Sequence, residues 1–252
     1  MIDITYDMYR DNYFIDACRL PEDSVHIWRY MDFAKLMSII DAQELFFTTS
    51  DKFEDSFEGS FPQKCAAENY CLDKNTAKEL AKVTINFRKY AHLNCWHQNE
   101  CESEAMWKIY SQSDRGIAIQ STIGRLKHCF TDEREVNIGK VKYIDYNVDA
   151  IPVGDFFSPF FYKRKSFSYE QEIRALVQTL DDVPIEKREK NYPEGIYPYG
   201  IGIKIDINLL IENIYISPYA PNWFYDLIKS ITLKYGYNFN IKKSILSAKP
   251  MF

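Results

Sequence analysis

Residues 92 to 110 constrain the fold of this chain more than any other segment, because they combine two tryptophans, two histidines and two cysteines with several glutamates. An ordinary hydrophobic core does not need that mixture. The pattern predicts a strand over residues 92 to 97 that runs into a helix near Asn99, with Asn99 as the N-cap and Glu102 three residues later. Ligand-binding and catalytic side chains often lie at such junctions. The segment therefore predicts a functional site at a strand-to-helix junction.

The composition is that of a globular protein, with 46% hydrophobic and 27% charged residues among 252. No run of about 18 apolar residues is present to span a bilayer, so no membrane partner is expected. The first residues lack a basic region followed by an apolar one, which makes the cytoplasm the expected location. We expect a single domain over residues 1 to 252, with residues 1 to 23 as an N-terminal extension and 181 to 198 as a long loop.

The net charge of -5 argues against broad adhesion to nucleic acid, although the basic run Lys163-Arg164-Lys165 could meet a phosphate.

Two of the cysteine pairs share one spacing, Cys65 with Cys71 and Cys95 with Cys101. Structural zinc sites usually take paired ligands separated by two to four residues, and these pairs are separated by five. Disulfides need an oxidising compartment, which nothing in the sequence indicates. We therefore expect reduced, mostly buried thiols and no metal.

Hydrophobic periodicity predicts an α+β fold with a mixed, mainly antiparallel central sheet flanked by helices. Asp32 is the expected N-cap of the first helix after the extension. The expected strands cover residues 26–30, 45–49, 92–97, 116–122, 136–145, 173–179, 199–206, 213–217 and 239–245. The expected helices cover residues 33–40, 64–90, 156–165 and 222–234, besides the one near Asn99.

Glu170 and Glu172 are the clearest candidates for acid and base chemistry. Residues two apart in a strand face the same way, so both carboxylates would lie on one face. Two carboxylates that close raise each other's pKa and can divide acid and base roles. Paired glutamates are also common on solvated faces, and the pattern alone leaves both interpretations open.

The order of these motifs resembles a widespread bacterial and phage-associated family that is catalogued as a domain of unknown function. The resemblance runs from about residue 24 to the C-terminus and is carried by Arg29-Tyr30, residues 53–59, Cys95-Trp96-His97, residues 102–110, Lys163 and residues 169–174. It implies no established reaction. Relatives of this kind imply a defence or toxin role.

A more distant resemblance is to the ADP-ribosyltransferase superfamily. In that superfamily a first-strand arginine or histidine holds NAD, a polar second strand supports the nicotinamide ribose, and a glutamate entering a later strand is catalytic. The resemblance implies that Arg29 binds NAD, that Thr48 belongs to the polar second strand, and that Glu172 is catalytic with Glu170 beside it. Its departures are the short spacing between the first two elements, the threonine at 48 where serine is usual, and the central tryptophan and histidine segment.

Under the transferase hypothesis, several further residues would bind a nucleotide-like ligand. Tyr30, Lys163 and Arg174 would contact the cofactor, and His97 is either a general base or a structural histidine. Trp96, Trp107 and Tyr110 would stack on a base or nicotinamide, although aromatic residues at such spacing are more often core. Arg29 suits a phosphate because of its planar fork, but a structural ion pair with Glu172 or Asp55 is an equal alternative.

Two other classes of function remain open. A metal-dependent nuclease or phosphodiesterase would place carboxylates around magnesium with a cation near phosphate. Its residues would be Asp55, Glu58, Glu170 and Glu172, with Lys163 or Arg174. A restriction-like nuclease would have lysine two residues after the carboxylate, and the chain has Glu172 there. The third class is a non-catalytic module that binds a nucleotide or a protein. For a transferase, the expected partners are NAD and a macromolecular acceptor, protein or nucleic acid.

Overall fold

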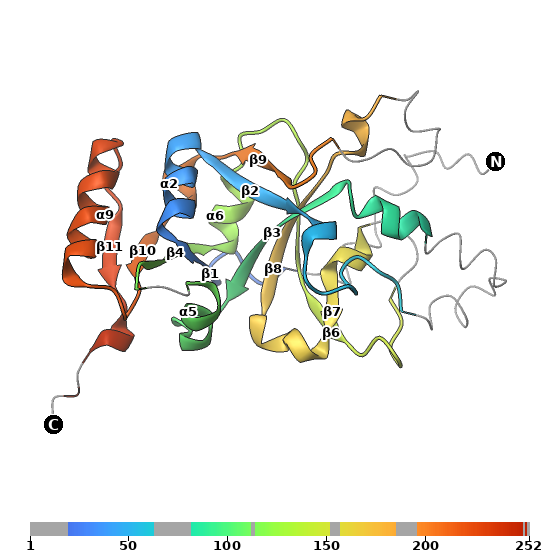
Figure 1. Ribbon diagram of the computed structural model, residues 1–252, viewed down its shortest axis with the longest axis horizontal. Helices are drawn as coiled ribbons and strands as arrows, with labels where there is room; N and C mark the ends of the chain where they lie inside the picture. Colours follow the sequence, from blue (N-terminus) through green and yellow to red (C-terminus); the bar gives the residue numbers. More distant parts are fainter. Residues whose placement is uncertain are drawn as a thin grey trace.

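The computed structural model describes residues 20–62, 82–111, 114–151, 157–184, 196–248 and 250. Within these ranges nine strands form one sheet in which neighbours are antiparallel, except for the parallel pair β10 and β11 at one edge (Figure 1). The strands are β1 (His26–Asp32), β2 (Glu44–Thr49), β3 (Ala91–Gln98), β4 (Gly116–Thr122), β5 (Asn137–Lys140), β8 (Glu172–Gln178), β9 (Gly200–Lys204), β10 (Asn213–Ile216) and β11 (Asn240–Lys243). The predicted α+β class with a mainly antiparallel sheet and flanking helices is confirmed.

Helices flank this sheet on both faces. They are α2 (Phe33–Ala42), α5 (Glu104–Tyr110), α6 (Ile123–His128), α8 (Ile207–Leu210) and α9 (Asn222–Lys234). A small parallel sheet pairs β6 (Lys142–Ile144) with β7 (Tyr162–Arg164). Short 3-10 segments are η2 (Ser50–Lys52), η3 (Ser158–Phe161), η4 (Lys165–Glu170), η5 (Leu180–Asp182) and η6 (Ile245–Ser247). No helix among the described residues has the length and apolar character needed to cross a bilayer.

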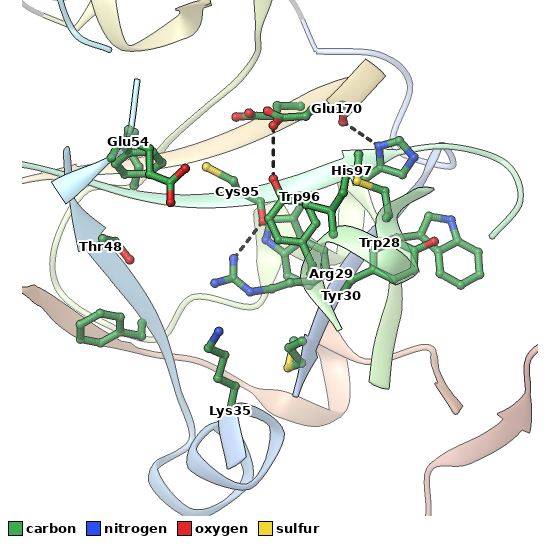
Figure 2. Close-up of a pocket in the computed structure, with 18 of the residues that line it drawn as sticks. Trp28, Arg29, Tyr30, Lys35, Thr48, Glu54, Cys95, Trp96, His97 and Glu170 are labelled. Atoms are coloured by element: carbon green, nitrogen blue, oxygen red, sulfur yellow. Dashed lines mark hydrogen bonds between the residues drawn. The ribbon is translucent and has the colours of Figure 1, made fainter. Parts of the chain in front are cut away.

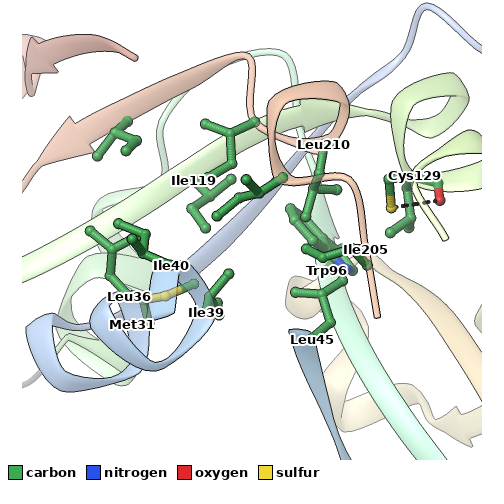
Figure 3. Packing of buried hydrophobic residues seen from close by; sticks show 14 of the residues in the cluster. Met31, Leu36, Ile39, Ile40, Leu45, Trp96, Ile119, Cys129, Ile205 and Leu210 are labelled. Atoms are coloured by element: carbon green, nitrogen blue, oxygen red, sulfur yellow. Dashed lines mark hydrogen bonds between the residues drawn. The ribbon is translucent and has the colours of Figure 1, made fainter. Parts of the chain in front are cut away.

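Alternation along β1 divides the core between the two faces of the sheet. Ile27 and Met31 join the large cluster that α2, α6, α8 and α9 cover (Figure 3). Trp28 and Tyr30 point to the opposite face, where they pack with Trp107 of α5. This period of two is the pattern of a strand buried on both faces.

The sheet is split on one edge of β3. Strand β8 pairs with β3 from Ala91 to His97 and occupies the other edge. On the split edge, β1 meets β3 only at the end nearest Gln98, and β2 meets it only at Leu93 and His92. Residues 94–96 therefore have no strand beside them on this edge, while α2 connects β1 to β2 across the gap.

Side chains bond the backbone groups that a continuous sheet would have paired around this gap. Arg29 Nη1 donates to the carbonyl oxygen of Cys95 at 3.0 Å, and Asn94 Nδ2 donates to the carbonyl oxygen of Phe46 at 2.9 Å. Buried backbone polar groups need such partners, so these bonds allow the split to persist.

Helix α2, which connects β1 to β2, has a defined cap at each end. Asp32 is its N-cap, as predicted, and accepts a hydrogen bond from the backbone N–H of Lys35 at 2.8 Å. Gln43 ends the helix in the left-handed conformation with φ 54°, and it donates from its own backbone N–H to the carbonyl of Ile39. The helix that bridges the split thus begins and ends at defined residues.

Three local predictions are wrong. The helix predicted over residues 156–165 is replaced by η3 and β7, because Pro159 begins a 3-10 turn and the next residues pair with β6. The strand predicted over residues 136–145 divides into β5 and β6, which belong to different sheets. The N-cap of α5 is Ser103, whereas the carbonyl of Asn99 accepts from the Trp28 indole.

Other predictions lie partly or wholly outside the described residues. The helix predicted over residues 64–90 is described only from residue 82, and the loop at 181–198 only at its two ends. The N-terminal extension is described from residue 20. Cys65 and Cys71 also fall outside the described ranges.

Replacing Asp32 by alanine removes the N-cap of α2 and should lower the free energy of unfolding by about 1 kcal/mol. Asp32→Asn keeps a capping oxygen and should remain close to wild type. Urea unfolding followed by circular dichroism measures both variants. Equal loss in the two variants would show that the charge of Asp32, and not its cap, is what matters.

Candidate active site

A cleft of about 1120 Å³ opens at the split in the sheet (Figure 2). One wall is formed by β1, α2 and β2, and β3 lies behind the gap. The other wall comes from α5, β7, η4 and the start of β8. Nine of the residues predicted from sequence line this cleft: Arg29, Tyr30, Thr48, Trp96, His97, Tyr110, Lys163, Glu170 and Glu172.

Arg29 is a half-buried cation in the cleft wall. It lies in the middle of β1, not at its end as predicted, and its guanidinium is 6.0 Å from the centre of the Trp96 ring. Burial lowers the pKa of Arg29, but arginine stays protonated in proteins. Its bond to the Cys95 carbonyl uses one of five N–H donors, which leaves donors for a ligand.

The alternative that Arg29 forms a structural ion pair is wrong. Asp55 pairs with Arg164 at 2.8 Å, and Glu172 pairs with other cations. In the described part of the chain, no carboxylate lies within ion-pair distance of Arg29.

Five buried charged side chains form a cluster opposite Arg29, which we call the carboxylate cluster: Glu58, Lys163, Glu170, Glu172 and Arg174. Lys163 Nζ donates to Glu172 Oε1 at 2.6 Å and also pairs with Glu170. Arg174 Nε donates to Glu172 Oε2 at 2.5 Å, and its two terminal nitrogens bond Glu58 at 2.7 and 2.9 Å. All five are nine-tenths buried or more, so the solvated-face interpretation of the glutamate pair is wrong.

The two glutamates meet because of a backbone kink between them. Glu170 ends η4, and Glu172 begins β8. Gln171 between them has φ 41°, in the left-handed region that non-glycine residues rarely adopt. The common face predicted from strand alternation is therefore not the cause of their proximity.

The surroundings separate the pKa values of the pair. Burial, and then the neighbouring Glu172, raise the pKa of Glu170 to about 7. Burial alone would raise the pKa of Glu172 as well, but the Arg174 charge, a hydrogen bond from Glu170 and Lys163 hold it below its ordinary range. Divergent values in one pair are the usual sign of an acid and base assignment. At neutral pH Glu172 is thus an anion, and Glu170 exchanges a proton.

Lys163 keeps its charge between the two glutamates. Burial would lower its pKa, but Glu172 and other charges of the cluster raise it. Its ammonium contacts both carboxylates, which gives Lys163 a role inside the carboxylate cluster. Its contact with a cofactor stays a prediction.

His97 supports the backbone of Glu170. Its Nδ1 donates to the Glu170 carbonyl oxygen at 2.6 Å, and its Nε2 accepts from Asn99 at 3.3 Å. Burial lowers the pKa of His97, so the ring is neutral with the proton on Nδ1. This arrangement favours the structural alternative over a general base.

Among the predicted stacking residues only Tyr110 offers an exposed ring. Tyr110 is 47% exposed, and its hydroxyl donates to Glu170 Oε1 at 3.3 Å. Trp96 and Trp107 are each 1% exposed and belong to the hydrophobic core, which favours the core alternative for both rings. Tyr30 lines the cleft at 8% exposure, and its hydroxyl accepts from the Ser103 backbone.

Two predicted residues are absent from the cleft wall. Trp107 lies behind Tyr30, with its indole bonded to Glu102. Arg174 has no exposed surface, because it lies between Glu58 and Glu172. Both were expected to contact a cofactor, and both instead support residues that can.

The structure adds cleft residues that the sequence reasoning missed. Lys35 of α2 lies in the wall near Arg29 (Figure 2). Arg164 and Phe167 also line the cleft, and the Phe167 ring lies 4.7 Å from Lys163 Nζ and 5.4 Å from the Arg164 guanidinium. Arg164 belongs to the basic run at 163–165, which was a usable signal. Lys35 looks like any exposed helix lysine, so no sequence pattern could have selected it.

The carboxylates of the proposed magnesium site already have cationic partners. Asp55 pairs with Arg164, Glu58 with Arg174, and Glu172 with both cations of the carboxylate cluster. Within the described ranges, no three histidine, cysteine, aspartate or glutamate side chains are grouped as metal ligands. This geometry does not favour the nuclease alternative.

No family model matches the chain, and no curated protein matches it. Among solved structures, Thermus sp. 2.9 DarT in complex with NAD+ superposes with a TM-score of 0.40 at 10% identity, covering 91% of this chain and 99% of that one. DarT in complex with ADP-ribosylated ssDNA gives a TM-score of 0.42 at 8% identity, covering 92% and 100%. At these values the chemistry of the cleft has to be argued from its own side chains.

Replacing Arg174 by methionine should lower the free energy of unfolding by roughly 3–5 kcal/mol, because Glu58 and Glu172 would be left buried without a cation. Lys127→Met is the matched control, since Lys127 forms an exposed ion pair with Asp23. The control should lose less than about 1 kcal/mol. Chemical denaturation of both variants makes the comparison, and similar losses would contradict the assigned role of Arg174.

Proposed function

We propose that the protein is an NAD-dependent glycosyl transferase that moves ADP-ribose from NAD to an acceptor. One observation carries the proposal: a half-buried arginine and a buried glutamate pair line a single cleft where the sheet is split. Cleavage of the nicotinamide–ribose bond needs an anion beside the ribose and a cation beside the pyrophosphate. The cleft has both.

The cleft fits a dinucleotide in size and charge. Ligand pockets usually measure about 300–1000 Å³, and this one is about 1120 Å³. Arg29 would hold the pyrophosphate through its planar donors, and Lys35 at the mouth adds a second positive charge. Tyr110 offers an exposed ring on which a base or the nicotinamide would stack.

Glu172 is the anion of the proposed reaction. As the bond between ribose C1 and the nicotinamide nitrogen breaks, its electron pair leaves with nicotinamide and positive charge develops on the ribose. Lys163 and Arg174 keep Glu172 ionised and fixed in place. A preorganised charge of this kind stabilises the transition state without reorganisation.

Glu170 is the proton carrier of the proposed reaction. The acceptor attacks ribose C1 and gives up a proton, which ionised Glu170 would take. A pKa of about 7 suits this task at neutral pH. Tyr110 and His97 hold the side chain and the backbone of Glu170 from two directions.

Two substitutions test the proposed roles. Glu172→Gln keeps the size and removes the charge, so turnover should fall by roughly 10² or more. Arg29→Lys should weaken NAD binding roughly tenfold or more, because an ammonium cannot reproduce the guanidinium fork.

Mass spectrometry of NAD consumption and calorimetry of NAD binding measure these effects. Arg125→Lys, on the outer surface of α6, is the control for a loss of guanidinium alone. The proposal fails if the wild-type protein neither binds nor consumes NAD with water, protein or nucleic acid as acceptor.

The proposed reaction should also depend on pH. Because the ionised form of Glu170 accepts the proton, kcat/KM should rise as the pH increases through about 7. Glu170→Gln should give lower activity and remove this rise. A rate that falls over the same range would mean that protonated Glu170 is the active form.

A further inference from the structure

The carboxylate cluster contains an imbalance of charge that the proposed reaction does not by itself explain. Three carboxylates, Glu58, Glu170 and Glu172, are in contact with two cations, Lys163 and Arg174. Burying an uncompensated charge is costly, so such a cluster takes up a proton instead. We infer that Glu58 is a positioning residue whose charge forces Glu170 to hold that proton.

Glu58 lies at the back of the cleft lining with a side chain that is only 1% exposed. It comes from the loop after β2, far in sequence from the other members. Both of its oxygens bond Arg174, and one also lies 3.5 Å from Lys163 Nζ. Glu58 therefore partly neutralises both cations, Arg174 and Lys163, which would otherwise neutralise only Glu170 and Glu172.

Glu170 is the member that keeps the proton because it contacts only one of the two cations. Glu58 has the two terminal nitrogens of Arg174, and Glu172 has Arg174 Nε together with Lys163. Glu170 contacts only Lys163 among the cations of the cluster, and its other oxygen accepts from the neutral Tyr110 hydroxyl.

The groups around Glu170 come from every element packed against it. They are His97 of β3, Tyr110 of α5, Tyr143 of β6, Lys163 of β7, Tyr169 of η4 and Glu172 of β8. Burial raises the pKa of the Tyr110 and Tyr143 hydroxyls, and His97 is neutral. Apart from Lys163, none of these groups supplies positive charge at neutral pH, so Lys163 is the cation that decides whether Glu170 ionises.

Removing the charge of Glu58 should therefore leave Lys163 and Arg174 to neutralise only Glu170 and Glu172. In Glu58→Gln, two carboxylates share two cations, and Glu170 should ionise roughly one pH unit lower or more. A substitution that only loosened the packing would lower the stability of the fold. It would not shift the titration of Glu170 to lower pH.

The inference rests on the proposed function only for its catalytic consequence, so the main test avoids turnover. Carbon NMR of glutamate side chains labelled at the carboxyl carbon follows Glu170, assigned by its loss in Glu170→Gln. The samples are wild type, Glu58→Gln, the double variant Glu58→Gln with Arg174→Gln, and Asp55→Asn.

The double variant restores the imbalance, because two carboxylates then share Lys163 alone, and the raised titration of Glu170 should return. Asp55→Asn removes a carboxylate from the same loop that pairs with Arg164 outside the carboxylate cluster, and it should leave Glu170 unchanged.

An unchanged Glu170 titration in Glu58→Gln would overturn the inference, as would an equal change in Asp55→Asn. If Glu58→Gln does not fold, the wild-type spectrum decides: a proton on Glu58 or Glu172 at pH 7, with Glu170 ionised, also overturns it.

The activity profile separates the two proposals. If NAD is consumed, the rise of kcat/KM with pH should move to lower pH in Glu58→Gln together with the NMR titration. If NAD is not consumed but the titration moves as expected, the role of Glu58 stands and the transferase proposal fails. If NAD is consumed while the titration of Glu170 stays fixed in Glu58→Gln, the transferase proposal stands and the inferred role of Glu58 fails.

Discussion

The guanidinium of Arg174 is the contact on which the site depends. It joins Glu58, from the loop after β2, to Glu172 at the start of β8, and it also donates to the Phe160 carbonyl in η3. The acidic loop, η3 and β8 thus meet on one side chain with no exposed surface. A charge so deeply buried is tolerated only when its partners are complete. The position of the acidic loop and the charge of the glutamate pair are therefore linked.

The split beside β3 is a second constraint on the fold, because it leaves backbone N–H and C=O groups in the middle of the sheet without a neighbouring strand. Two side-chain bonds, from Arg29 to Cys95 and from Asn94 to Phe46, satisfy groups that strand neighbours would have paired. Arg29 thus has a structural task and keeps donors for a ligand at the same time. Each wall of the cleft is built on hydrogen-bonded strands, so the side chains of one wall keep fixed positions relative to one another, which favours preorganised chemistry.

Much of the fold could be predicted from sequence, because alternation and capping act locally. The Asp32 cap and the α9 helix are examples, and burial on both faces explains why β1 reads as a strand. The site was predictable only in part. The left-handed Gln171 and the 3-10 turn at Pro159 depend on long-range packing, which no local pattern encodes. Trp96 was ambiguous for a similar reason, since a core ring and a stacking ring look alike in sequence.

The split also has a mechanical consequence. Strand β3 carries β1 at one end and β2 at the other, and its full-length ladder with β8 lies on the opposite edge. A twist of this one strand would swing the two arms of the sheet apart without breaking any strand pairing. The width of the opening would then follow the twist of β3, and α2, which connects β1 to β2, would limit how far the two arms separate.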